Sequence, residues 1–176
     1  MIVVSENLKG LIEQTSLVPL TALDEFSITL TLSKDIVRLD VPNGQEVVYG
    51  TTVPKECIKE EMLTDALVLS PRQAVLACSK EFVKMPKGYM GLLQTKGSLA
   101  RLFISVHCSD GQVEPGFEGR VTFEICNMGN ATVKILNGAP IAQMFIFKTS
   151  SNKVAYNGKY CHSQKPTISY QDKNEE

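Results

Sequence analysis

Apolar and polar residues alternate singly along much of this 176-residue chain, a pattern typical of β-strands that bury one face. The alternation is clearest over residues 27–32 and continues over 35–41 until a Pro-Asn-Gly turn. Similar short segments, most of them bounded by turn residues, follow at 67–69, 74–82, 91–94, 102–107, 119–127, 131–136 and 141–148. Many short strands with regular turn signals predict an all-β fold, either a barrel or a jelly-roll-like architecture.

A helical spacing interrupts this pattern near the start of the chain. Three apolar residues there fall on one side of a helix, namely Leu8, Leu11 and Ile12. Ser5 precedes this stripe, and serine is a residue type that caps helix starts, so a short N-terminal helix is expected over residues 5–13. Residues 98–101 could begin a second, shorter helical turn.

The length and composition of the chain favour one domain with an ordinary hydrophobic core. Residues 1–148 are expected to form that domain, with 43% hydrophobic and 21% charged residues over the whole chain. The polar stretch 149–176 is either disordered or an arm that orders over the active site. A net charge of −1 provides no global field for nucleic acid or for an anionic membrane, so neither is expected as a partner.

The five cysteines indicate neither a disulfide framework nor a zinc site, because their number is odd and no Cys-x-x-Cys motif occurs. Reduced thiols in a cytoplasmic protein are the simplest interpretation. The first apolar stretch gives way to polar residues after four positions, too early for a signal peptide, and no later stretch is long enough to span a bilayer.

The chemically richest segment is 96–141. Within it, Glu124 stands between Phe123 and Ile125, so on a strand its side chain points to the face opposite theirs. A carboxylate that faces a closed interior is costly unless it has a partner or a chemical role. The turn Lys96-Gly97-Ser98 could cradle phosphates with its backbone N–H groups, its ammonium and its hydroxyl, although this short motif alone is weak.

Four ordered blocks between residues 96 and 143 resemble the family of dCTP deaminases and trimeric dUTPases. A Ser-Leu-Ala-Arg turn ends at Arg101, the acid Glu114 of a Glu-Pro-Gly-Phe corner follows thirteen residues later, and Glu124 follows ten residues after that. A Gly-x-x-Ile-x-Gln block then ends at Gln143. The resemblance is strongest over residues 85–147, and it implies a distorted jelly-roll-like β-barrel of the dUTPase-like (β-clip) type.

Two positions separate the branches of this family. Its dUTPases normally have an apolar residue at the place of Glu124 and no arginine at the place of Arg101, whereas its dCTP deaminases have both. The resemblance therefore implies catalytic roles for Glu124 as general acid/base and for Arg101 in orienting that carboxylate or the attacking water. It also implies nucleotide contacts for Lys96, Gly97, Ser98, Asp110, Glu114, Thr122, Phe123, Gln143, Tyr156, Lys159 and Gln164.

The leading hypothesis is hydrolysis of dCTP to dUTP and ammonia. One carboxylate in a water-poor pocket can take a proton from water and deliver it to the base, because burial raises its pKa toward neutrality. The motifs of zinc-dependent deaminases are missing from the sequence, so no zinc is expected, and Mg²⁺ would arrive with the triphosphate. The family further implies a homotrimer whose sites are shared between neighbouring subunits.

Several residues depart from the deaminase pattern. Lys96-Gly97-Ser98 stands in place of Arg-Ser-Ser, Asp110 in place of a small alanine, and Glu114 in place of aspartate. In the arm, Ser163 occupies the place of the usual glutamine, with Gln164 one position later. Two alternatives therefore stay open: a diphosphatase acting on dUTP or dCTP, alone or after deamination, and a catalytically silent nucleotide-binding relative. Each of three residues also has a purely structural interpretation. Glu124 would form a salt bridge in an interface, Arg101 would form an ordinary ion pair, and Glu114 would be an exposed acid in a turn.

Overall fold

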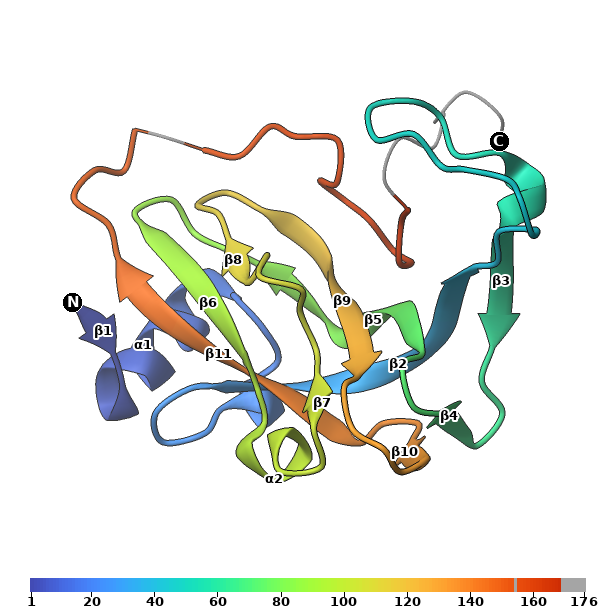
Figure 1. Cartoon of the computed structure of the whole chain (residues 1–176). Coiled ribbons are helices and arrows are strands. Elements are labelled where there is room, and N and C mark those ends of the chain that lie inside the picture. The colour runs from blue at the N-terminus through green and yellow to red at the C-terminus, as the bar shows by residue number, and fades with distance from the viewer. Residues whose placement is uncertain (154, 169–176) are drawn as a thin grey trace.

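Strands dominate the computed structural model, which describes residues 1–153 and 155–168 (Figure 1). The described part of the chain forms one large curled sheet with the order β7-β9-β5-β2-β11-β6-β8, while β1 pairs with β11 and β3 with β2. Its strands are β1 (Ile2–Val3), β2 (Ile28–Leu39), β3 (Ile58–Met62), β5 (Ala74–Lys84), β6 (Tyr89–Thr95), β7 (Ile104–Ser105), β8 (Gln112–Val113), β9 (Glu118–Asn127) and β11 (Pro140–Lys148). A separate pair is formed by β4 (Ala66–Leu69) and β10 (Val133–Leu136).

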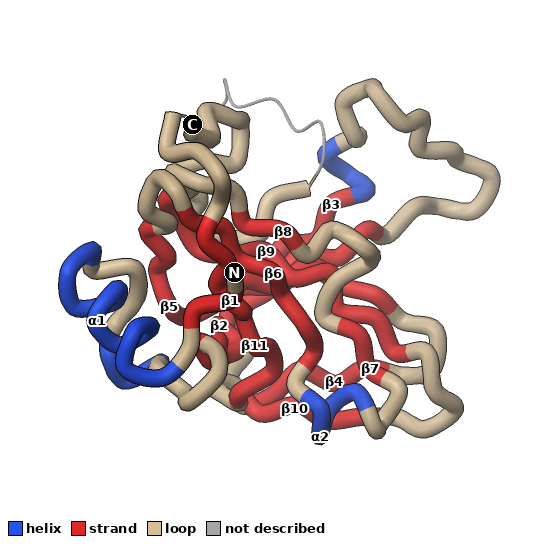
Figure 2. Tube along the Cα trace, turned by 90° about the vertical axis from the view of Figure 1, so that its left-hand side faces the viewer, coloured by secondary structure: helices blue, strands red, loops and turns tan. Residues whose placement is uncertain are grey.

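The helical elements are short and lie outside the sheet (Figure 2). They are the α-helices α1 (Ser5–Thr15) and α2 (Gly97–Ala100) and the 3-10 turns η1 (Leu20–Ala22) and η2 (Lys55–Cys57). Helix α1 buries the predicted apolar stripe against the sheet, as its three members are at most 8% exposed. Ser5 makes no capping hydrogen bond, because Val4 occupies the capping position, so that detail of the prediction is wrong.

Strand β9 shows the alternation of the sequence most clearly. Its residues are alternately half-buried and fully buried from Glu118 to Asn127. Phe123 and Ile125 are completely buried in the core, and Glu124 between them faces the other side of the strand. The two-residue period of a strand therefore assigns the apolar residues of β9 to the core and leaves its polar residues for a second face.

The expected all-β class with a short N-terminal helix is confirmed, with changes in several strands. The predicted strands 27–32 and 35–41 are one strand, β2, whose register with β5 shifts between Leu32 and Ile36. The predicted strand 102–107 shrinks to β7, because Phe103 adopts a left-handed φ of 59° directly after α2. Strand β3 was not expected, since its charged sequence lacks an alternating pattern and it pairs only along one edge of β2.

The described part of the C-terminal arm, residues 155–168, returns across the start of β9 (Figure 1). The N–H of Tyr156 donates to the Pro115 carbonyl at 2.6 Å, and the N–H of Arg120 donates to the Ser163 carbonyl at 2.8 Å. Gly116 has a φ of 83°, and a Cβ atom built on it would lie 2.9 Å from the Cβ of Ala155. Glycine therefore permits both the turn and the close approach of the arm.

Among the described residues, no helix combines the length and the apolar character needed to cross a membrane.

Candidate active site

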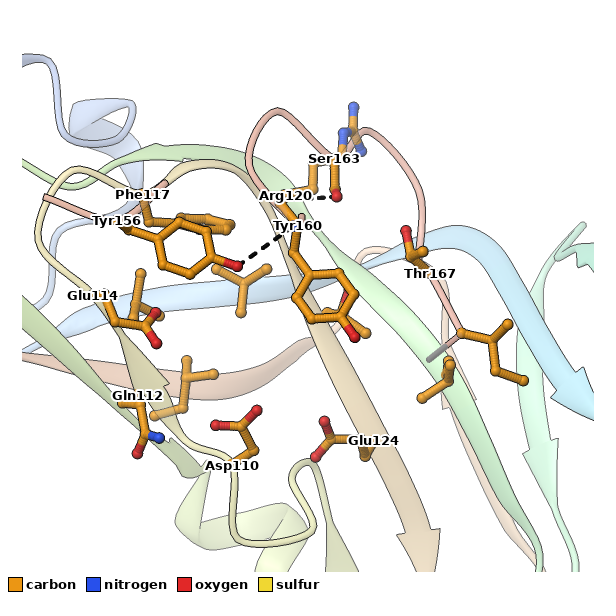
Figure 3. Close-up of a pocket in the computed structure, with 16 residues that line it drawn as sticks. Asp110, Gln112, Glu114, Phe117, Arg120, Glu124, Tyr156, Tyr160, Ser163 and Thr167 are labelled. Atoms are coloured by element: carbon orange, nitrogen blue, oxygen red, sulfur yellow. Dashed lines mark hydrogen bonds between the residues drawn. The ribbon is translucent and has the colours of Figure 1, made fainter. Parts of the chain in front are cut away.

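A pocket of about 460 Å³ opens between β9, the β8 region and the C-terminal arm (Figure 3). Its volume lies within the range of small-molecule sites, which is roughly 300–1,000 Å³. Its lining residues are Leu76, Leu93, Asp110, Gln112, Val113, Glu114, Phe117, Arg120, Val121, Thr122, Glu124, Tyr156, Tyr160, Ser163, Thr167 and Ile168. Because strands, one loop and the arm all contribute, the pocket forms only when the chain is folded around it.

Strand β9 supplies the polar floor of the pocket. Arg120, Thr122 and Glu124 are spaced by two residues, so they share the face of the strand opposite to the core. The Arg120 guanidinium is tied to β2 and β5, since its Nη1 donates to Ser33 Oγ at 3.3 Å and to the Ser79 carbonyl at 3.4 Å. These bonds hold the guanidinium toward β2 and β5, and Figure 3 shows it directed away from Asp110, Glu114 and Glu124.

Glu124 is a half-buried carboxylate with a raised pKa. Burial is the largest cause, and the negative charge of Asp110 acts in the same direction. Two groups oppose this rise: the Cys108 N–H, which donates to Glu124 Oε2 at 2.7 Å, and His107. Figure 3 shows the Glu124 carboxylate directed toward Asp110. A carboxyl group whose pKa is raised toward neutrality can both accept and return a proton, which is the property required of a general acid/base.

The other charges of the pocket make it acidic. Asp110 in the loop before β8 and Glu114 directly after β8 line it together with Glu124, and Arg120 is the single cation among the lining residues. Three carboxylates and one guanidinium suit the hydrogen-bond donors of a base or a sugar. By themselves they repel a polyphosphate.

The arm closes the pocket on its outer side. The ring of Tyr156 packs against that of Phe117, with 6.0 Å between the ring centres, and its hydroxyl accepts a hydrogen bond from the Tyr160 N–H at 3.4 Å (Figure 3). Burial raises the pKa of Tyr156, so this hydroxyl stays protonated at neutral pH. Ile168 at the far end of the described arm packs with Val53 and Cys57, which fixes a second point of attachment.

The structure brings together only part of the predicted site. Asp110, Glu114, Thr122, Glu124 and Tyr156 line one pocket, and their catalytic and nucleotide-binding roles remain predictions. The residues of the predicted phosphate turn and Arg101 do not line this pocket. Lys96, Gly97, Ser98 and Arg101 belong to α2 and its two ends, which lie at the end of the molecule away from the arm (Figures 1 and 2). Arg101 is exposed and does not contact Glu124 through any hydrogen bond or ion pair in the described part of this chain.

Four other predicted contacts also lie outside the pocket lining. The Phe123 side chain is fully buried in the core, so any nucleotide contact of this residue would have to come from its backbone. Gln143 lies on β11, where its amide donates to Ser27 Oγ at 3.3 Å. Lys159 stands over the Tyr160 ring at 4.9 Å, and Gln164 is exposed with its amide near the His162 carbonyl. Gln143, Lys159 and Gln164 remain predictions.

Several lining residues were missed from the sequence. Arg120 could have been found, since it shares the two-residue spacing of Glu124 on a predicted strand. Tyr160, Ser163 and Thr167 could not, because they reach the pocket only through the path of the arm. Among the described residues, no group of three or more histidine, cysteine, aspartate or glutamate side chains is arranged to hold a metal ion.

Comparisons with known proteins identify the family of this chain. The sequence model of the dCTP deaminase-like family matches residues 2–149. A dCTP deaminase, dUMP-forming, from Methanoculleus marisnigri is 34% identical over 114 residues, which cover 62% of this chain and 61% of that protein. The corresponding protein from Methanobrevibacter smithii is 30% identical over 163 residues, which cover 89% of this chain and 80% of that protein.

A solved structure shares the fold. The crystal structure of 2'-deoxycytidine 5'-triphosphate deaminase from Agrobacterium tumefaciens matches 82% of this chain and 47% of that chain, with a TM-score of 0.64 and 15% sequence identity. In sequence, the chain spans about 61% of the length of the M. marisnigri relative. The family match over most of the chain decides the classification. This chain belongs to the dCTP deaminase-like family, and the resemblance inferred from its motifs is confirmed.

Proposed function

We propose that this chain hydrolyses the 4-amino group of dCTP, with Glu124 as the general acid/base, in pyrimidine deoxynucleotide metabolism. One observation carries the proposal: a half-buried carboxylate with a raised pKa points into a pocket of nucleoside size, in a chain of the dCTP deaminase-like family. Relatives in the same family are named as dCTP deaminases.

The chemistry follows from the position of Glu124. Ionised Glu124 accepts a proton from water as the water oxygen attacks C4 of cytosine, and it then delivers that proton to the ring nitrogen or to the departing amine. The Cys108 N–H holds one carboxylate oxygen and leaves the other free for this transfer. Glu114 and the arm tyrosines would contact the sugar and close the site, while Mg²⁺ would accompany the triphosphate as part of the substrate.

The acidic lining supports a second part of the proposal, a site shared between copies of the chain. The pocket contains one cation, whereas Lys96 and Arg101 are placed together at the ends of α2, outside it. A triphosphate needs cations nearby, so we propose that α2 of a neighbouring copy supplies them to the pocket of the first. A homotrimer with cyclic symmetry would repeat this contact three times.

The product is the point on which the relatives and the leading hypothesis differ. Deamination alone yields dUTP, whereas both relatives described above are named dUMP-forming. Their names favour the bifunctional alternative, in which the diphosphate is also cleaved from this chain's nucleotide. Glu114 is the candidate for activating water at the α-phosphate in that case, because it lines the pocket apart from Glu124 (Figure 3).

One assay tests these possibilities. The full chain is incubated with dCTP and Mg²⁺, and ammonia and pyrophosphate are measured in the same samples. Ammonia without pyrophosphate indicates the dUTP-forming deaminase, and equal amounts of both indicate the bifunctional enzyme. Pyrophosphate alone from dUTP or dCTP would identify a diphosphatase instead. The release of neither, together with thermal stabilisation by dCTP, would identify a silent nucleotide-binding relative.

A further inference from the structure

Two cysteine sulfurs lie in contact beside the candidate active site. Cys108 Sγ and Cys126 Sγ are 3.3 Å apart, within reach of a sulfur–sulfur hydrogen bond. Cys108 is exposed in the loop that follows β7, and Cys126 is partly buried near the end of β9. No other pair of the five cysteines makes a sulfur–sulfur contact among the described residues.

This pair is joined directly to Glu124. Cys126 follows Glu124 by two residues on β9, so the two side chains leave the same face of the strand. From the other side, the Cys108 N–H donates to Glu124 Oε2 at 2.7 Å, and the Cys108 thiol lies 3.8 Å from the Glu124 carbonyl oxygen. The loop that carries Cys108 therefore holds both the thiol contact and the carboxylate.

The two sulfurs differ in accessibility. Burial and the neighbouring Cys108 thiol raise the pKa of Cys126 to about 11, so Cys126 is a protonated thiol at neutral pH. The exposed Cys108 is the sulfur that a small molecule in solution reaches first. A disulfide has a sulfur–sulfur bond of roughly 2.05 Å, so the two atoms must approach by a little more than about 1 Å to bond.

We propose that Cys108 and Cys126 form a reversible thiol-modification site, in which exchange with a small disulfide links them and disturbs the hydrogen bond that holds Glu124. In the first step, Cys108 attacks one sulfur of the small disulfide and releases one thiol. In the second step, Cys126 loses its proton to water, the resulting thiolate attacks the Cys108 sulfur, and the other half of the small disulfide leaves as a thiolate that takes up a proton. The protein dithiol loses two electrons and two hydrogens, and the small disulfide becomes two thiols, so the exchange is balanced.

We expect disulfide formation to move the loop that carries Cys108 and to leave β9 in place. Cys126 is held in the sheet from both sides, since it pairs with Ala74 of β5 and with Ser105 of β7. Formation of the bond would therefore draw Cys108 toward the strand and displace its N–H from the Glu124 carboxylate. Loss of this charge-assisted hydrogen bond disfavours the ionised form of Glu124, which the proposed deamination requires.

Oxidised glutathione provides the test of the modification site. The full reduced chain is incubated with it, free thiols are counted, and disulfide-linked peptides are mapped by mass spectrometry. We expect the loss of two thiols, a peptide pair that links Cys108 to Cys126, and complete reversal by dithiothreitol. Cys126→Ser should retain a glutathione adduct on Cys108 and form no link, while Cys161→Ser is a matched control that should still form it.

Three results would overturn the proposal: a wild-type chain that keeps only a glutathione adduct on Cys108, one that links Cys108 to a different cysteine, and one that stays unmodified. The consequence for Glu124 rests on the proposed function and has its own readout. Ammonia release from dCTP should fall about tenfold on linkage, the scale of one lost hydrogen bond to a charged group, and recover on reduction. An unchanged rate in the linked protein would refute the effect on Glu124. A chain that releases no ammonia when reduced would instead refute the proposed function, leaving the peptide mapping valid.

Discussion

The pocket on β9 and the turn at α2 differ in charge and in completeness. The pocket encloses Glu124 between a strand, a loop and the arm, yet among its lining residues Arg120 is the single cation. The α2 turn carries Lys96 and Arg101 at its two ends but buries no residue of its own. Each region holds what the other lacks for binding an anionic nucleotide. The proposed sharing between copies would let a second chain supply the half of the site that the first chain lacks.

The largest effect is expected from Glu124→Gln, which tests the catalytic role proposed for the β9 pocket. Glutamine keeps the shape of the side chain but cannot take up a proton, so ammonia release should fall about 10³-fold or more while dCTP binding persists. Initial rates of ammonia release and thermal stabilisation by dCTP would measure the two effects. Glu118→Gln is the matched control, because Glu118 lies on the same strand face outside the pocket lining and its variant should retain activity. Turnover by Glu124→Gln at the wild-type rate would eliminate this acid/base assignment.

Mixing two inactive variants tests whether the regions meet between chains. Arg101→Ala should lose about 100-fold in rate, because Arg101 is proposed to complete a neighbouring pocket. When Arg101→Ala and Glu124→Gln chains are coexpressed in equal amounts, the mixed protein should show about a quarter of the wild-type activity. In a shared site, an intact Glu124 and an intact Arg101 are each present with a probability of about one half, and both are needed. A mixture no more active than its parents would place Arg101 and Glu124 in the same chain's chemistry, and sedimentation as a monomer would exclude sharing.

Asp110→Asn examines the charge balance within the pocket. Burial is the largest cause that raises the pKa of Glu124, and the negative charge of Asp110 is the next. Removal of the Asp110 charge should therefore lower the pKa of Glu124. Because the proposed base must be ionised, the rate rises as pH rises through this pKa, and the acidic limb of the kcat/KM profile should move to lower pH. Asp40→Asn, an exposed change outside the pocket, should leave that limb in place. If the acidic limb of the kcat/KM profile does not move in Asp110→Asn, a group other than Glu124 controls the activity at low pH.

The smallest effect is expected where the arm approaches the pocket. Gly116→Ala adds a methyl group 2.9 Å from the Ala155 Cβ atom at a φ of 83°, so it should loosen the arm and reduce the free energy of unfolding by about 1–2 kcal/mol. Gly138→Ala has a similar φ of 78° but no neighbour within 4 Å, so it isolates the cost of the backbone conformation.

Hydrogen exchange of residues 155–168 and chemical denaturation would compare the two glycine variants. Faster exchange confined to Gly116→Ala, relieved by adding Ala155→Gly, is the expected result. Equal exchange in both variants would show that the arm does not depend on this contact.

The sequence was enough to predict that Glu124 lies on the strand face opposite to Phe123 and Ile125, because the alternation of polar and apolar residues in β9 is visible in the sequence. The same alternation places the Phe123 side chain in the core, so the nucleotide contact that the resemblance implies for this residue could involve only its backbone. Strand β3 was missed because it is stabilised by pairing with β2 and not by an apolar pattern of its own. Tyr160 and Thr167 reach the pocket through the long-range path of the arm, and neither local propensity nor spacing encodes that path.

The strict alternation along β9 also has a consequence for how this protein can evolve. Substitutions at its even-numbered positions can alter substrate preference while the core partners at the odd positions stay as they are. An insertion or deletion of one residue before Glu124 would instead exchange the two faces, exposing Phe123 and burying the carboxylate. We therefore expect relatives with divergent activities to vary this strand by point substitution while conserving its length.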